Sequence, residues 1–184
     1  MSDRFISHPY SLGQTGPSGT LTHLAGRECE HLDLDYSNAP TYAPAPLSES
    51  IVTSVWVKND SGGAINGKTG ITWKSGYYRK SIGAASGALA IASGFVDPNI
   101  TSVADGDYCH VIVKGPCTLI SDGAASISQG NSVVTASSGK VTKLQTTAAD
   151  AITAQNQANA VCAQAMEAAT NVDGTTFRAY VNCK

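Results

Sequence analysis

Short apolar runs separated by glycine-bearing turns begin at residue 51 and continue to the end of the chain. The run IVTSVWVKN, residues 51–59, alternates as a strand with one buried face does. It ends in NDSGGAINGK, where Asn, Asp and Gly suit the positive φ angles of tight turns. A second strand region follows in GITWKSGYYRKSI, residues 70–82. This pattern is typical of antiparallel β-structure.

The clearest strand signals lie between residues 103 and 144. Apolar runs there alternate with the turn signals DGD, GP, DGA, QGN and SSGK, and they predict strands at 109–115, 117–121, 131–137 and 140–144. The turn TNVDGT leads to a last strand in FRAYVNC, residues 177–183. This spacing predicts a small antiparallel β-barrel or β-sandwich body over residues 51–184.

Two segments of this body are ambiguous. Residues 82–100 mix small residues with glycines and fit either a strand with a bulge or a loose loop. In residues 146–170 the alanine content favours helix, while the neighbouring segments favour strand. We expect at most one short helix, or a loop, up to Asn156, followed by a strand near Asn159–Met166.

Residues 1–50 differ from the body because they hold five of the seven prolines. Proline cannot donate a ladder hydrogen bond, so SNAPTYAPAPLSES, residues 37–50, is predicted to be an extended connector that forms strand poorly. Isolated tyrosines, Tyr10, Tyr36 and Tyr42, lie along this arm. An extended arm with such aromatic residues gains order by lying on its own domain, on a sister subunit or on a partner.

Charge is sparse, since charged residues make up 14% of the chain against about 25% in an average soluble protein. The formal net charge is -2 and the basic residues are dispersed, which argues against a nucleic-acid partner. Neither a secretory signal nor a run of about 20 apolar residues is present, so we expect cytosolic synthesis and no membrane partner. The five cysteines are expected to be free buried thiols, with a Cys109–Cys117 disulfide as the alternative.

Motifs for catalysis are missing from the sequence: it has no G-x-S-x-G elbow, no phosphate loop and no HExxH helix. We therefore predict no enzyme, no catalytic residue and no cofactor. His110 lies in the apolar run YCHVIV and is interpreted as a strand histidine with an ordinary hydrogen bond. The pair Asp105 and Asp107 lies in a turn, where Asp bonds the backbone.

Possible metal ligands cluster in RECEHLDLDYS, residues 27–37. Alternation would place His31, Asp33 and Asp35 on one side of an extended chain, which leaves a divalent cation site open. The favoured alternative is a solvated face with Leu32 and Leu34 packed inward, so no metal is predicted. Four aromatic residues of the body, Trp56, Trp73, Tyr77 and Tyr78, could form a ligand platform, although such residues more often anchor a core or a subunit interface.

Four segments together resemble the small capsid decoration, or cement, proteins of tailed bacteriophages. They are VKNDSGGAINGKTGITW, SVADGDYCHVIVKGPCTLISDG, ISQGNSVVTASSGKV and CAQAMEAATNVDGTTFRAYV, and they span residues 57–181. In that family a strand with a polar turn, a glycine-flanked apolar run and a closing alanine-rich strand with an Asp-Gly turn follow one another. The resemblance implies a β-barrel or β-tulip-like body that sits on the major capsid protein lattice as a trimer, or less often as a dimer.

The function implied by the resemblance is that of a virion structural protein made in the host cytoplasm and located on the outer capsid surface. It would bind the major capsid protein and itself, and it would stabilise the lattice by bridging neighbouring capsomers. Candidate capsid or subunit contacts are His8, Pro9, Tyr10, Tyr36, Tyr42, Trp56, Trp73, Tyr77 and Tyr78. Deletion of residues 1–46 is then expected to abolish capsid binding. The alternative function is a receptor- or glycan-binding module of a phage tail or fibre.

Overall fold

The computed structural model describes residues 10–35, 45–145 and 151–183. Its strands are β1 (Glu28–Asp35), β2 (Ala45–Asn59), β3 (Ile65–Asn66), β4 (Gly70–Trp73), β5 (Ser81–Ala85), β6 (Gly94–Val96), β7 (Ser102–Val103), β8 (Tyr108–Ile120), β9 (Ser132–Thr135), β10 (Val141–Lys143), β11 (Val161–Ala165) and β12 (Thr176–Asn182). The helices are α1 (Ala151–Asn159) and the short 3-10 turns η1 (Thr22–Leu24) and η2 (Ser137–Gly139). The mainly β fold predicted from the sequence is confirmed.

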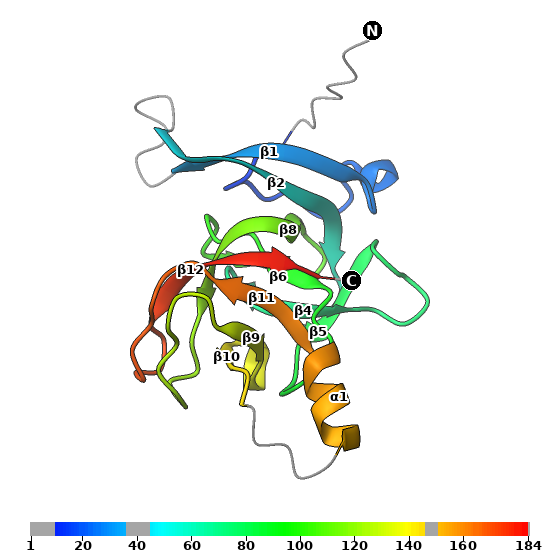
Figure 1. Ribbon diagram of the computed structural model, residues 1–184. Coiled ribbons are helices and arrows are strands. Elements are labelled where there is room, and N and C mark those ends of the chain that lie inside the picture. Colours follow the sequence, from blue (N-terminus) through cyan, green and yellow to red (C-terminus); the bar gives the residue numbers. More distant parts are fainter. Residues whose placement is uncertain (1–9, 36–44, 146–150, 184) are drawn as a thin grey trace, which may run out of the picture.

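A closed ring of strands forms the centre of the molecule. The order of the large sheet is β1-β2-β5-β4-β6-β8-β12-β11-β9-β10, and an additional pairing of β2 with β8 closes the segment from β2 to β8. The strand pairs of the ring are antiparallel except for β2 with β5, which run parallel. Strands β12, β11, β9 and β10 continue from β8 as a second curved layer (Figure 1).

Strand β8 belongs to both layers. Its first half pairs with β2 and β6, and its second half pairs with β12 over Lys114–Ile120. Gly115 lies at this change of partner with φ +105°, and a Cβ there would lie 2.5 Å from the Ile51 carbonyl oxygen. Glycine is required because other residues are strained at positive φ and the partner backbone leaves no space.

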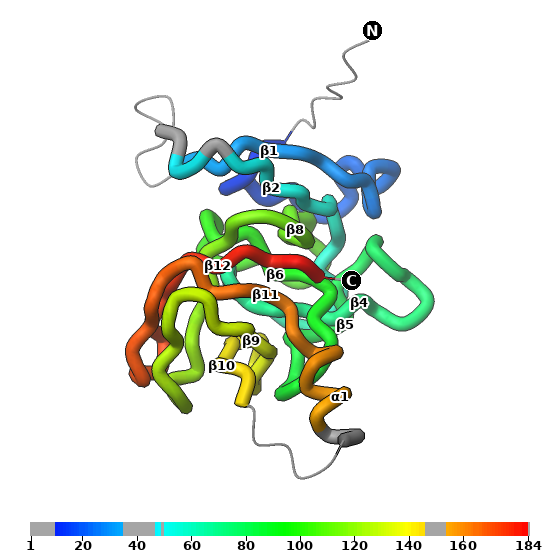
Figure 2. The backbone as a smooth tube through the Cα atoms, viewed as in Figure 1, coloured from blue at the N-terminus to red at the C-terminus, as the bar shows by residue number. Residues whose placement is uncertain are grey.

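The N-terminal part of the chain packs on the body. Strand β1 pairs with β2 from Ala45 onward, so the stretch after Pro44 is strand where the sequence predicted a connector that forms strand poorly. Pro46 is tolerated because this end of β2 pairs with β1 alone, and an edge position needs no donor on its outer side. The β1–β2 ribbon lies across the top of the ring (Figure 2).

The ambiguous segments are resolved by these elements. Residues 82–100 contain most of β5, a loop and then β6. Helix α1 is followed at once by β11, which confirms the predicted change from helix to strand. All five cysteines are free, as expected, but only Cys109, Cys117 and Cys162 are buried, whereas Cys29 and Cys183 are partly exposed. Cys109 and Cys117 lie on the same strand, roughly 25 Å apart along it, which excludes the alternative disulfide.

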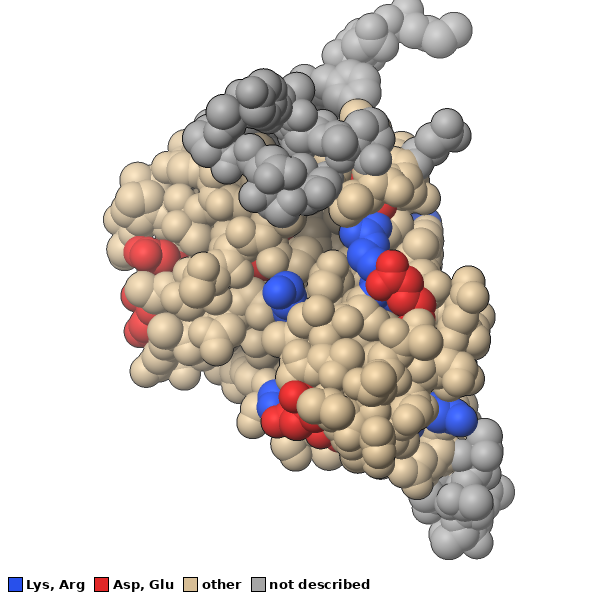
Figure 3. Space-filling model, turned by 90° about the vertical axis from the view of Figure 1, so that its left-hand side faces the viewer, with Lys and Arg blue, Asp and Glu red and all other residues tan. Residues whose placement is uncertain are grey.

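Charged side chains are scattered over the surface, and the face in Figure 3 shows them as small spots on an otherwise uncharged area. In the described parts of the chain they form five ion pairs, which are Lys58–Asp60, Lys74–Asp60, Arg79–Glu28, Lys140–Asp173 and Arg178–Asp33. The last is unusual because the Asp33 side chain is only 5% exposed.

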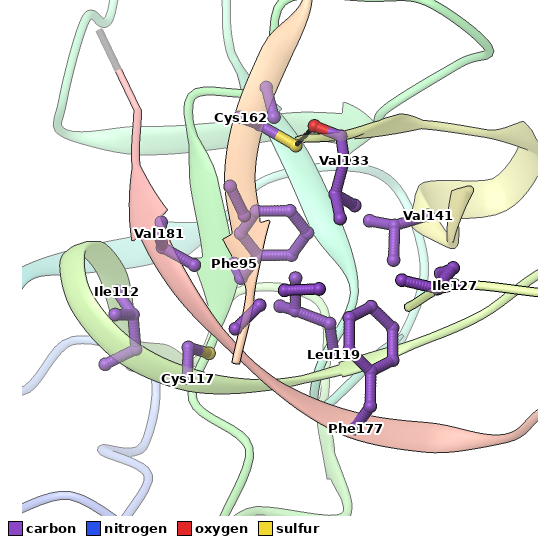
Figure 4. Close-up of a cluster of buried hydrophobic side chains, with 14 of the residues drawn as sticks. Phe95, Ile112, Cys117, Leu119, Ile127, Val133, Val141, Cys162, Phe177 and Val181 are labelled. Carbon is purple, nitrogen blue, oxygen red and sulfur yellow. Dashed lines mark hydrogen bonds between the residues drawn. The ribbon is translucent and has the colours of Figure 1, made fainter. Parts of the chain in front are cut away.

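Two hydrophobic clusters fill the molecule. One lies inside the ring and includes Val55, Ile71, Ile82 and Val111. The other lies between β8 and the second layer, where Phe95 and Phe177 point toward the same centre as Leu119, Ile127, Val133 and Val141 (Figure 4). Full burial of each large side chain contributes about 1.5–3 kcal/mol, so these clusters supply the main stabilisation of the fold.

Candidate functional site

The inner face of β1 carries polar residues. Cys29, His31 and Asp33 alternate along the strand and share this face, and Asp33 is 4% exposed. Leu32 points the opposite way and is 60% exposed. The predicted solvated polar face with Leu32 packed inward is therefore wrong. The polar residues are accommodated inside because they find hydrogen-bond and ion-pair partners there.

Asp33 connects β1 to the second layer of strands. Its carboxylate pairs with the Arg178 guanidinium of β12 and accepts a hydrogen bond of 2.6 Å from the Ser48 hydroxyl. Asp33 and Arg178 line a cavity of about 120 Å³ together with Leu47 and Pro116. The side chain of Asp35, the third member of the cation site that the sequence left open, lies outside the described residues.

His31 and His110 are linked through one hydroxyl group. His31 Nε2 and His110 Nδ1 each lie 2.9 Å from Ser54 Oγ, and His110 Nε2 lies 3.0 Å from the Tyr10 carbonyl oxygen. A carbonyl only accepts, so His110 Nε2 donates to it. In neutral His110 the Nδ1 atom is then an acceptor, Ser54 donates to it, and His31 Nε2 donates to Ser54.

His110 is thus a buried strand histidine with hydrogen bonds, as expected, but its partners could not be predicted from the sequence. Ser54 and His110 are both 0% exposed. A substrate cannot reach the Ser54 hydroxyl, so proximity of serine to histidine does not create a nucleophile here. The only signal for His31 was its alternation with Cys29 and Asp33 in the arm.

Cys29 completes a group of metal-type donors with the two histidines. One ligand atom each from Cys29, His31 and His110 lies within 4.8 Å of the others. Cys29 and His31 are partly exposed. Burial raises the pKa of the Cys29 thiol, and the charge of Arg27 partly offsets this.

Segment 10–16 contacts His110 through the Tyr10 carbonyl and is fixed by side chains of the body. The Tyr10 ring stacks on Trp56 with ring centroids 5.0 Å apart, and Gly13 donates a 2.6 Å hydrogen bond to the Asp97 carboxylate. Burial raises the pKa of Asp97, partly offset by hydrogen bonds from Asn99 and Gly13. Trp56 is 0% exposed. It is therefore a core residue, which corrects its prediction as a capsid or subunit contact.

The other predicted aromatic contacts of the body gather at one place. Tyr77 and Tyr78 lie in the turn between β4 and β5 and are 54% and 66% exposed. Trp73 packs edge-on against Tyr78 with ring centroids 6.2 Å apart. A cavity of about 180 Å³ opens beside them, lined also by Arg79 and Asn182. The remaining predicted contacts, His8, Pro9, Tyr36 and Tyr42, lie outside the described residues.

The outer face of the β1–β2 ribbon is apolar at one point. Leu32 and Ile51 are directly opposite each other in the β1–β2 register and are 60% and 52% exposed. We call them the outer apolar pair. Strand β1 is also an edge of the large sheet, and an edge strand offers unpaired backbone groups to another chain.

No protein-family model matches the chain, and no curated protein is similar to it. Among solved structures it is similar to the N base of the head fiber protein gp8.5 of bacteriophage phi29. The TM-score is 0.48 at 15% sequence identity, over 71% of this chain and 94% of the phage chain. A likeness of this size establishes neither a shared fold nor a shared function. Among the described residues, no helix has the length and apolar character needed to cross a bilayer.

Proposed function

We propose that this protein is a virion structural protein that attaches to the outer surface of a phage head. In this proposal it binds the major capsid protein as a homo-oligomer, with a trimer favoured, and bridges neighbouring capsomers. The observation that supports it best is the outer apolar pair, Leu32 and Ile51, exposed on an edge ribbon. Aliphatic side chains in such a position gain free energy when another protein covers them.

The sparse charge of the surface supports the same proposal. Charged residues are depleted at the buried centres of protein interfaces, and only 14% of this chain is charged. One weak contact per subunit is sufficient on a lattice, because binding to several neighbours at once multiplies the affinity. The four sequence segments that resemble decoration proteins also support a capsid partner. No enzymatic step belongs to this proposal.

Deletion of residues 1–46 is a poor test, because it would remove β1 and Leu12, which belongs to a hydrophobic cluster. A sharper test is the full-length double variant Leu32→Lys and Ile51→Lys. We expect the wild type to cosediment with undecorated phage heads and the variant to bind at least tenfold more weakly. The control, Leu89→Lys with Ile91→Lys, changes two exposed aliphatic residues in the β5–β6 loop and should bind normally.

Thermal melting of both variants would check that they fold, and analytical ultracentrifugation of the wild type would test the trimer. Failure of the wild type to cosediment with heads would refute attachment to the capsid. Equal binding by the two double variants would show that the outer apolar pair is not the contact.

Glycan binding is a second candidate function, favoured by the cavity beside Trp73 and Tyr78. Aromatic rings next to hydrogen-bonding side chains such as Arg79 and Asn182 suit a sugar, which presents both C–H and O–H groups. A glycan array with the full-length protein tests this function. Binding should be lost in Tyr78→Ala and kept in Tyr180→Ala, which removes a tyrosine of β12 that does not line the cavity.

A further inference from the structure

We propose that Cys29, His31 and His110 form a binding site for a transition metal ion of the zinc type. Thiolate sulfur with imidazole nitrogen is the donor set that Zn²⁺ prefers, whereas Mg²⁺ and Ca²⁺ prefer oxygen. One such atom from each residue already lies within 4.8 Å of the other two. This inference goes beyond the proposed attachment to a phage head and does not depend on it.

The strand geometry explains why the three donors converge. Cys29 and His31 are two residues apart on β1, so they project from the same face. Cys29 is directly opposite Ser54 of β2, and His110 lies one strand further, on β8. Strands β1 and β8 therefore present the three donors to one space beside Ser54 of β2, where the two imidazole rings meet edge to face with centroids 4.9 Å apart.

His110 is oriented as metal-bound histidines are. Such a histidine commonly donates its second ring N–H to a backbone carbonyl or carboxylate, which fixes the tautomer and directs the other nitrogen at the ion. Here His110 Nε2 donates to the Tyr10 carbonyl, so Nδ1 faces Ser54 Oγ. His31 Nε2 faces the same oxygen atom. The two nitrogens thus point at one position, which the Ser54 hydroxyl now occupies.

An ion can be accommodated with small movements. Bonds of about 2.0–2.1 Å to nitrogen and 2.3 Å to sulfur in a tetrahedral arrangement require donor atoms roughly 3.3–3.6 Å apart. The distances between the three ligand atoms, which are now up to 4.8 Å, must therefore shorten by an ångström or slightly more. Cys29 and His31 are partly exposed and can rotate, while buried His110 stays fixed. Because Ser54 Oγ lies where the two nitrogens point, its side chain must rotate to admit the ion, and the rotated hydroxyl or a water molecule then supplies the fourth ligand.

Coordination uses the thiolate form of Cys29, so binding releases the thiol proton to solvent. Asp33 on the same face does not compete for the ion, because Arg178 and Ser48 hold its carboxylate. The donor set is therefore one thiolate and two neutral imidazoles, which leaves a net charge of +1 on a complex with a divalent ion.

The experiment titrates metal-free, full-length protein with Co²⁺, which reports thiolate coordination by a charge-transfer absorption band, and then displaces it with Zn²⁺. We expect one Co²⁺ per chain. In Cys29→Ser the charge-transfer band should disappear, and in His31→Gln the affinity should fall at least about tenfold. Both residues are partly exposed, so these variants should keep the wild-type fold, which circular dichroism checks.

Matched controls are Cys183→Ser and His23→Gln, which change a cysteine and a histidine that are not among the three proposed ligands. Both should bind Co²⁺ as the wild type does. The proposal is overturned if the wild type shows no charge-transfer band, or if Cys29→Ser keeps it. Loss of the band in a control but not in Cys29→Ser would likewise assign the metal to other residues.

Discussion

The ion pair between Asp33 and Arg178 attaches the β1–β2 ribbon to β12, and its removal should cost far more stability than removal of a surface pair. The substitution Arg178→Met keeps most of the apolar stem and removes the charge. Asp33, with a side chain 5% exposed, then remains as a carboxylate with the Ser48 hydroxyl as its remaining hydrogen-bond partner. The buried charge, rather than the lost attraction, causes the destabilisation.

The size of the effect follows from burial. Breaking a fully buried pair costs about 3–5 kcal/mol. Arg178 is 19% exposed and Ser48 still donates to Asp33, so we expect the lower end, about 3 kcal/mol. For a chain of this length 1 kcal/mol lowers the melting temperature by about 2–4 °C, which gives a decrease of roughly 6–12 °C.

Urea unfolding and thermal melting measure this difference directly. The control is Arg79→Met, which breaks the Arg79–Glu28 pair, with side chains 32% and 54% exposed, and should cost less than about 1 kcal/mol. The double variant Arg178→Met with Asp33→Leu should regain most of the loss, because no buried charge remains. If Arg178→Met is no less stable than Arg79→Met, the reasoning from burial is refuted.

Three further predictions concern backbone, pH and thiols. Gly115→Ala should destabilise by more than about 2 kcal/mol in urea unfolding, while Gly87→Ala, where a Cβ meets no atom within 4 Å, should change little. Burial raises the folded-state pKa of Asp97 above its ordinary value of 3.8, so its contribution to stability is present below that value and lost as pH rises through the raised pKa. The stability of Asp97→Asn relative to the wild type should therefore increase across that window in urea titrations. A thiol reagent at pH 8 should modify partly exposed Cys29 before Cys162, whose pKa burial raises to about 12; equal rates in the native protein would contradict this.

The sequence predicts the local part of the fold well. Strands in residues 103–144 and 177–183 follow from alternation and turn residues that lie close together along the chain. The turn predicted at Gly115–Pro116 is wrong, because β8 runs without interruption over Tyr108–Ile120 and changes its partner strand there. The change from helix to strand near Asn159 was also expected, because the alanine content favours helix while the neighbouring segments favour strand. In these segments local propensity and tertiary structure favour the same conformation.

Non-local features escaped prediction. Strand β2 begins in proline-rich sequence. The β1–β2 ribbon is stabilised by pairing between the two strands and by contacts such as that of Asp33 with Arg178, 145 residues away. For the same reason the polar face of β1 appeared solvated, since its partners come from β2, β8 and β12. For Trp56 the sequence left a core position and an interface position open, and its burial depends on the rings of Tyr10 and Tyr108, which stack with it from distant parts of the chain.

Strand β8 contributes side chains to both hydrophobic clusters, with Val111 in the ring and Leu119 in the second layer. Unfolding of either cluster would expose one end of β8. It would also weaken the strand pairing at the other end, where the second cluster lies. The molecule is therefore expected to be cooperative as a whole, with no intermediate in which one half persists. In the proposed attachment to a phage head, unfolding that begins at one contact would therefore extend to the entire chain.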